Sequence, residues 1–248
     1  MNDQAQVLDD RGSLDFRTSF LKTRLIVGLI GVALPIVLVV FDRVIFGATS
    51  FRDSLSAYYY SGMRDWFVGS LCAIGAGLFV YMATKKNVWD NWLSSIAGAC
   101  AVLVALFPTV PVDGARSLGS VLHVVFAAGL FSLLGVLSWR FGIRDRNRED
   151  RTVGQRKFWA GLHKACAVVI WLAIIGLALA PSNSIGGYST LLGEAVAVFA
   201  FGASWFFKGS ELLTMTIADK RQGARGRAHS LRVPETAFPD ALRTEAEG

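Results

Sequence analysis

His123 and Glu194 are the ionisable side chains of this sequence with the clearest potential for chemistry, because each lies inside a long apolar stretch. If both stretches are helices that enter a membrane from the same side, each residue lies roughly 9 Å deep. Ionisable residues at such depth are costly and mark functional sites by default. A histidine beside a carboxylate can act as a general acid or base, relay protons or bind a polar headgroup.

Other polar residues precede the second apolar stretch on the same side. Asp65 stands at its start, and we take His123, Glu194 and Asp65 as candidate catalytic residues. The candidate ligand-binding residues are Ser56, Tyr58, Tyr59 and Arg64. One alternative is a structural network in which Glu194 and His123 satisfy each other and lock the helices together, and another is ligand or lipid binding without chemistry. Whether the protein is an enzyme therefore stays open.

The elements that position these residues are membrane spans. The chain of 248 residues is 53% apolar and 18% charged, whereas a soluble domain is about 25% charged. A spanning helix needs about 20 mainly apolar residues. Six stretches qualify, near residues 24–46, 66–84, 91–109, 117–139, 159–180 and 188–207. We predict an all-α, six-transmembrane-helix bundle over 24–210, preceded by a cytoplasmic segment 1–23 and followed by a basic, disordered cytoplasmic tail 211–248.

The distribution of basic residues predicts the orientation of the bundle. With the N-terminus inside, all but four of the 25 Lys and Arg residues fall on the inner side. The exceptions are Arg43, Arg52, Arg64 and Arg116. Cytoplasmic loops carry this excess of positive charge, so both termini are expected in the cytoplasm. We expect a multi-pass protein of the cell membrane, which is the inner membrane if the source is bacterial.

No cofactor or metal is expected. Cys72, Cys100 and Cys166 all lie inside spans, and the sequence has no CxxC pair. His163 and His229 belong near or beyond the opposite membrane face, so neither can join His123 at a metal or haem. The loop between the fourth and fifth spans mixes both charge signs and is expected to be a solvated connector.

Membrane lipids are the expected partners. The basic tail is expected to attract anionic headgroups, at about 1 kcal/mol per basic residue. Stripes of small residues in the spans allow close helix packing and leave a homo-oligomer open. No nucleic-acid partner is expected, because the net charge of +6 follows the topology.

Four short motifs resemble a known family. They are DSLSAYYYSGMRDWFVG at 53–69, VALFPT at 104–109, LHVVFAAG around His123 and GEAVAVFAFGASWF around Glu194. Their order resembles the six-span family of the damage-regulated autophagy modulators and the GPI-anchor lipid-remodelling proteins, and uncharacterised bacterial proteins of the same build. The resemblance covers roughly residues 24–210. It implies a six-helix bundle with cytoplasmic ends and an association with lipid handling.

The resemblance carries over only Ser56, Asp65, His123 and Glu194 as candidate site residues. The eukaryotic members have a short Ile-Ser-Asp stretch where this chain has three tyrosines and an Arg-Asp pair, which argues against transferring a ligand from the family.

We therefore predict an integral membrane protein whose outer-facing intramembrane site binds or helps remodel a lipid or a small polar ligand. One alternative is a small proton-coupled transporter, and another is a non-catalytic membrane assembly subunit. A pocket that closes near mid-membrane favours binding, whereas a polar path through to Lys208 and Glu211 favours transport. Those two residues are three apart and are expected to pair.

Overall fold

The computed structural model describes residues 2–80, 88–111, 114–179 and 188–230, and all regular secondary structure in these ranges is helical, with no strand among the described residues. The elements in chain order are α1 (Asn2–Val44), the short 3-10 helix η1 (Ser56–Tyr60), α2 (Arg64–Phe79), α3 (Val88–Leu106), α4 (Leu118–Arg146), α5 (Val153–Leu179) and α6 (Ser189–Ser230). The predicted all-α class is confirmed.

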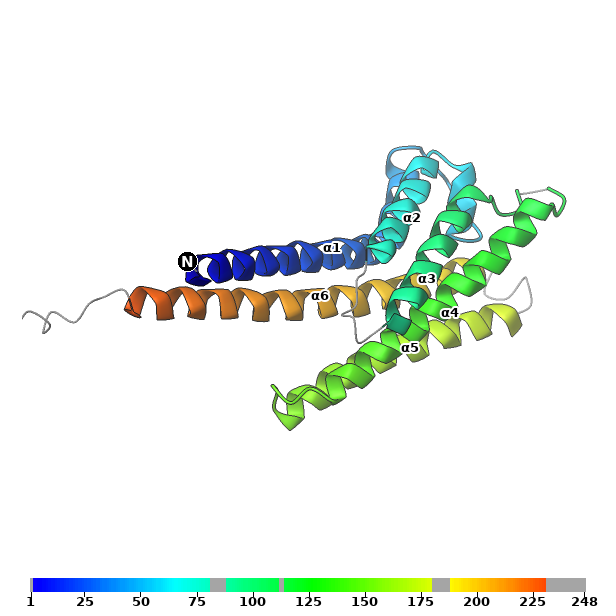
Figure 1. Cartoon of the computed structure of the whole chain (residues 1–248). Helices are drawn as coiled ribbons and strands as arrows, with labels where there is room; N and C mark the ends of the chain where they lie inside the picture. Colours follow the sequence, from blue (N-terminus) through cyan, green and yellow to red (C-terminus); the bar gives the residue numbers. More distant parts are fainter. Residues whose placement is uncertain (1, 81–87, 112–113, 180–187, 231–248) are drawn as a thin grey trace, which may run out of the picture.

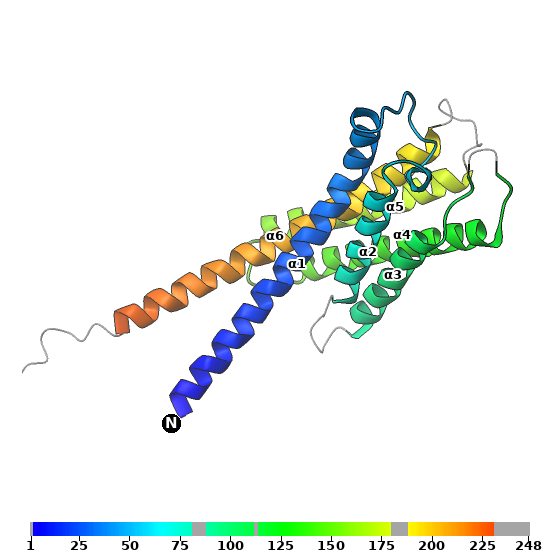
Figure 2. The same ribbon diagram turned by 90° about the horizontal axis from the view of Figure 1, so that it is seen from above.

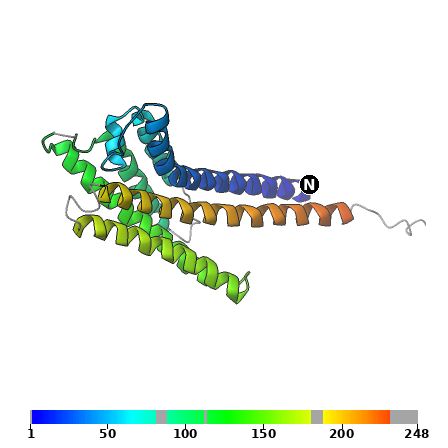
Figure 3. The ribbon, with the colours of Figure 1, turned by 180° about the vertical axis from the view of Figure 1, so that it is seen from behind.

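The helices form a closed ring in which each packs on its neighbours in the sequence, and α6 closes the ring by packing on α1 (Figures 1 and 2). The long helices α1 and α6 project well past α2 and α3 at one end of the molecule (Figures 1 and 3). We call this the tail end. The opposite end carries residues 45–63, which connect α1 to α2, and we call it the loop end.

Five helices are long and apolar enough to cross a membrane. They are Leu21–Val44 of α1, the whole of α3, α4 and α5, and Ser189–Glu211 of α6. Many of their large apolar side chains are exposed, such as Leu29, Val124 and Leu172. Apolar surface on this scale is costly in water and ordinary in lipid. The helices therefore indicate an integral membrane protein.

The second predicted span is the exception. Helix α2 has 16 residues, which corresponds to about 24 Å and falls short of a hydrocarbon core of about 30 Å. The rest of the predicted stretch 66–84 runs into residues outside the described part of the chain. The structure thus supports five of the six predicted spans by length and composition.

Two regions differ from the sequence prediction. The prediction that the loop between the fourth and fifth spans is a solvated connector is wrong in part. Helix α4 continues to Arg146, and Asp145 and Arg151 are buried. In addition, α6 continues through residues 211–230, where we expected disorder. Extending a helix that already exists avoids the unfavourable nucleation step, so a tail without an early proline can continue it. Residues 231–248 lie outside the described part.

Small residues let α1 and α6 approach each other closely. A Cβ atom on Gly31 would lie 2.9 Å from the Cα atom of Gly202, and one on Gly202 would meet the backbone of Gly28 and Gly31. The two backbones are therefore in direct contact, as small residues permit in membrane helices. The small residues Ala97, Ala101 and Ala105, which recur every four positions on α3, are buried, whereas Gly69 on α2 faces open space.

The 45–63 loop folds back into the loop end of the ring. Leu55, Tyr58 and Met63 are each at most 3% exposed, and burial raises the pKa of the Tyr58 hydroxyl. The backbone N–H of Leu191 at the start of α6 donates to the carbonyl of Asp53 over 2.9 Å. The loop is thus a packed part of the core, and its residues can line an internal site.

Replacing Gly202 with valine should destabilise the protein by about 1–3 kcal/mol, because the new side chain has no space between α1 and α6. The matched control is Gly176→Val on α5, since a Cβ atom there meets nothing within 4 Å. Thermal unfolding in detergent should show a lower midpoint for Gly202→Val than for the control. Equal midpoints would contradict the close α1–α6 contact.

Candidate functional site

A cavity lies inside the ring next to the 45–63 loop. Its volume is about 50 Å³. The lining residues come from α1, the loop, α2, α3, α4 and α6, and they are Leu34, Leu55, Ser56, Phe67, Leu71, Ile74, Val104, His123, Ala127, Leu130, Phe131, Leu134, Glu194, Val198 and Phe201. All are apolar except Ser56, His123 and Glu194. The two residues that the sequence singled out therefore share one cavity.

Glu194 binds the backbone of the loop. Its Oε2 atom accepts hydrogen bonds from the N–H groups of Leu55 at 2.6 Å and Ser56 at 3.3 Å. The Ser56 hydroxyl in turn lies 3.1 Å from that of Ser54. A carboxylate that accepts two backbone N–H groups in an apolar setting stabilises the segment that donates them. Glu194 therefore anchors the loop to α6.

His123 binds the end of α3. Its Nδ1 atom lies 2.7 Å from the carbonyl oxygen of Phe107, just beyond the last residue of that helix. A carbonyl can only accept, so Nδ1 carries the proton and Nε2 keeps the lone pair in the neutral ring. The last carbonyls of a helix lack partners within it, and His123 satisfies one of them. One ring nitrogen is thus used for structure and the other is left for chemistry or binding.

The remaining predicted site residues do not line the cavity. Asp65 is exposed in the first turn of α2. Arg64 donates from Nη2 to the Tyr59 hydroxyl over 2.7 Å and stacks on its ring at 4.4 Å, which forms a pair away from the cavity. Tyr58 is buried in the core cluster beside α1 and α2. Of the seven predicted residues, only Ser56, His123 and Glu194 come together.

A second polar site at the tail end was not predicted as a unit. Asp145 of α4 forms ion pairs with Lys208 of α6 and, at 3.8 Å, with Arg151. Arg151 also pairs with Glu211, which lies 3.6 Å from Lys208. These side chains are almost fully buried. We call Asp145, Arg151, His163, Lys208 and Glu211 the ionic cluster.

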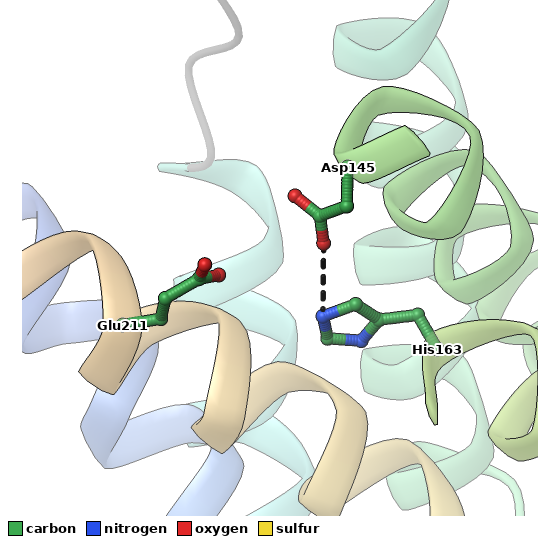
Figure 4. Close-up of side chains that lie close together, drawn as sticks. All are labelled: Asp145, His163 and Glu211. Carbon is green, nitrogen blue, oxygen red and sulfur yellow. Dashed lines mark ion pairs between the residues drawn. The ribbon is translucent and has the colours of Figure 1, made fainter. Parts of the chain in front are cut away.

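His163 of α5 joins the ionic cluster to the helix core. Its Nε2 atom lies 3.4 Å from Oδ2 of Asp145, and its Nδ1 atom lies 2.9 Å from the Ser204 hydroxyl on α6. Figure 4 shows Asp145 and His163 pointing at each other from α4 and α5, with the Glu211 carboxylate of α6 turned toward them. The approach of Nε2 to Oδ2 is a close polar contact and not a hydrogen bond, because neither atom has a hydrogen-bond partner among the described residues.

A related pairing joins α3 to α4. Asp90, which is fully buried, forms ion pairs with Arg140 and Arg144 one turn apart on α4. By contrast, Arg148 and Asp150 form a pair nearer the surface, and the hydrogen bond from Arg148 lowers the pKa of Asp150 to about 2. The tail end therefore holds carboxylates in two settings, with Asp90 and Asp145 inside and Asp150 outside.

Three residues of the ionic cluster have the donor atoms of a metal site. One ligand atom from each of Asp145, His163 and Glu211 lies within 4.8 Å of the others. Lys208 and Arg151 already bring positive charge to both carboxylates. A metal ion would have to displace these two cations, so the donor set fits an ion-pair network better than a metal centre.

The sequence contained a partial signal for this site. The pairing expected between Lys208 and Glu211 is confirmed at 3.6 Å. Asp145 was hidden in a charge-rich segment that is typical of a surface loop, and His163 was placed only by its depth. The missing information was that α4 runs on to Arg146, which brings Asp145 into the ring.

The fold and these sites define an integral membrane protein with a small internal cavity at one end and a buried ionic cluster at the other. No protein-family model matches the chain, and no curated protein or solved structure is significantly similar to it.

Replacing Asp145 with leucine should destabilise the protein by about 3–5 kcal/mol, because Lys208 and Arg151 would stay buried with too little negative charge. The double variant Asp145→Leu/Lys208→Met should regain much of that loss, since it removes both charges. Unfolding in mixed detergent and SDS micelles measures both effects. The control is Asp150→Leu in the surface pair, with an expected change of about 0–1 kcal/mol. A full loss in the double variant would contradict the pairing of Asp145 with Lys208.

Proposed function

We propose that this protein crosses the cell membrane six times with both termini in the cytoplasm, and that it binds a small amphiphile in the cavity at the loop end. The cavity then opens toward the outer leaflet, and the ionic cluster lies near the cytoplasmic face. The observation that carries the proposal is the cavity lining, in which apolar side chains surround Ser56, His123 and Glu194. Binding sites for small molecules commonly combine an apolar wall with a few polar groups that fix orientation.

The size of the cavity restricts the ligand. A volume of about 50 Å³ compares with about 150 Å³ for an engineered apolar cavity that binds benzene. The closed form therefore has room for a few waters or for the end of one narrow chain. A larger ligand enters only if Leu55 and Ser56, which form part of the wall, move with the loop. This favours a single-chain amphiphile over a whole two-chain lipid.

The polar groups have separate parts in this proposal. Glu194 is engaged by the loop backbone and by the Ser56 side chain, and the Ser56 hydroxyl also contacts that of Ser54. The uncharged groups left for a ligand are Nε2 of His123 and a remaining lone pair of the Ser56 hydroxyl. Both can bind a hydroxyl or a carboxylic acid headgroup. The resemblance to lipid-remodelling proteins agrees with such a ligand, and the same two groups are where acid–base chemistry would be sought.

The floor of the cavity supports binding in preference to an open channel. Toward the tail end, the last lining residues on α4 and α6 are Leu134 and Phe201. Both are at most 2% exposed and belong to a core cluster that continues through Phe141 and Trp205. The cavity therefore closes inside the bundle, as expected for a binding site that opens on one side.

Filling the cavity should abolish binding while leaving the fold intact. The variant is Ala127→Phe, whose ring would occupy the space beside His123, and the matched control is Ala128→Phe, which points away from the core on the same helix. A diazirine-bearing fatty acid in nanodiscs should crosslink to cavity-lining peptides of the wild type. We expect at least a five-fold loss of those crosslinks in Ala127→Phe and no loss in Ala128→Phe. Equal crosslinking of all three proteins would contradict the proposal.

The proposed orientation predicts a labelling pattern. In a background without Cys72, Cys100 and Cys166, a cysteine at the exposed loop residue Ser50 should react with a membrane-impermeant maleimide added to intact cells. A cysteine at Arg146, exposed at the end of α4, should react only after the cells are opened. The reverse pattern would overturn the orientation.

A further inference from the structure

We propose that the amphiphile bound at the loop end is a single-chain primary amine in its protonated form, and that the Glu194 carboxylate selects it. The proposal rests on the function proposed above for the same cavity, and it adds the chemical class of the headgroup. Two observations support it. Glu194 has no cationic partner among the described residues, and all three polar side chains of the cavity present hydrogen-bond acceptors.

Glu194 has hydrogen bonds but no countercharge in the part of the chain that the structure describes. The backbone N–H groups of Leu55 and Ser56 both donate to Oε2, which leaves Oε1 with lone pairs. No lysine or arginine is among the residues that line the cavity. A carboxylate inside a membrane protein is costly unless a cation pairs with it. A carboxylate that lines a cavity without such a partner therefore favours a cationic ligand.

The charged residues around the loop are placed so that they do not supply this cation. The arginines are engaged in contacts of their own, Arg52 with Asp42, Arg64 with Tyr59 and Arg43 with Phe51. The remaining charged residues described at this end are exposed, and they are Asp53, Asp65 and Arg116. The positive charge that balances Glu194 is thus left to a ligand.

The polar lining matches the donors of a primary ammonium group. Nδ1 of His123 donates to the carbonyl of Phe107, so Nε2 of the neutral ring is an acceptor. The Ser56 side chain bonds to Glu194, and its oxygen keeps a lone pair. With the Glu194 carboxylate these make three acceptors, and a primary ammonium group has three N–H donors and no acceptor. In a cavity of about 50 Å³, one such group can reach acceptors on different walls.

Other headgroups match this lining less well. A carboxylate brings a second negative charge beside Glu194, so a fatty acid enters only in its protonated form, with one donor. An alcohol also has one donor and carries no charge. A quaternary ammonium group has the charge but no N–H group. A site built to bind donors discriminates strongly against an analogue that lacks them, because its own polar groups are then left unpaired.

The apolar part of the lining accommodates the chain of the amine. From Glu194, the lining continues along α6 to Phe201, which lies about 10 Å nearer the tail end. Leu130 and Leu134 of α4 line the same part of the cavity. An amine whose head binds Glu194 beside the loop can therefore lay the start of its chain against apolar side chains.

Probes of equal chain length test the headgroup without any substitution. The wild-type protein in phosphatidylcholine nanodiscs is crosslinked with a diazirine-bearing primary alkylamine or with the matching fatty acid. Crosslinks to cavity-lining peptides are normalised to those at Leu172 on the exposed face of α5, which corrects for partition into the bilayer. We expect at least five-fold more cavity crosslinks from the amine, because it brings the charge and three donors.

Competition separates the N–H donors from the charge. Unlabelled dodecylamine should displace the amine probe at ten-fold lower concentration than dodecyltrimethylammonium or dodecanol. Equal cavity crosslinking by amine and acid, or equal competition by dodecylamine and dodecyltrimethylammonium, would overturn the choice of a primary amine and leave the proposed binding function standing. If neither probe labels the cavity, both proposals are wrong.

The variant Glu194→Gln tests the selecting group. Its amide oxygen can still accept from the loop N–H groups, but the negative charge is gone. Cavity crosslinks from the amine should fall at least ten-fold, whereas those from the fatty acid should stay within two-fold. The matched control is Asp53→Asn, which removes an exposed carboxylate of the same loop and should change neither yield. Unchanged amine crosslinking in Glu194→Gln, or equal loss of both probes, would show that Glu194 does not select the headgroup.

Discussion

A charge inside a membrane protein must find its compensation within the protein, and Asp145 is where this constraint is strongest. Its carboxylate is fully buried, and it contacts Lys208, Arg151 and His163 from the three directions of α6, the α4–α5 connection and α5. No single helix can supply these partners. The ion pairs therefore fix the mutual register of three helices, and the same is true of Asp90 for α3 and α4.

At the loop end, hydrogen bonds compensate buried backbone polar groups in the same way. A loop that enters the ring brings backbone N–H groups into an apolar setting, where each lacks water. Glu194 satisfies two of them and so holds Leu55 and Ser56 in the cavity wall. His123 does the same for a carbonyl at the end of α3. The two residues best suited to chemistry, Glu194 and His123, thus also hold the loop and the end of α3 in place. A movement of the loop therefore changes the cavity wall.

Between the two ends lies an apolar layer that contains Leu134, Phe201 and Trp205. It continues on α4 through Leu137 and Phe141, which are fully buried, and it separates the cavity from the ionic cluster. The apolar layer therefore closes the cavity toward the tail end.

The sequence by itself determined the all-helical class, the membrane character and the candidates His123, Glu194 and Ser56. Long apolar stretches, and ionisable residues inside them, can be recognised directly from the order of residues. It also predicted the pairing of Lys208 with Glu211, which follows from their spacing on one helix. Only the tertiary structure decided that Glu194 binds the loop backbone instead of pairing with His123. It also decided that Asp65 stays outside the cavity and that Asp145 and Arg151 are buried partners. The reason is physical. The burial of a charged residue depends on partners that other helices bring to it, and these partners are distant in the sequence.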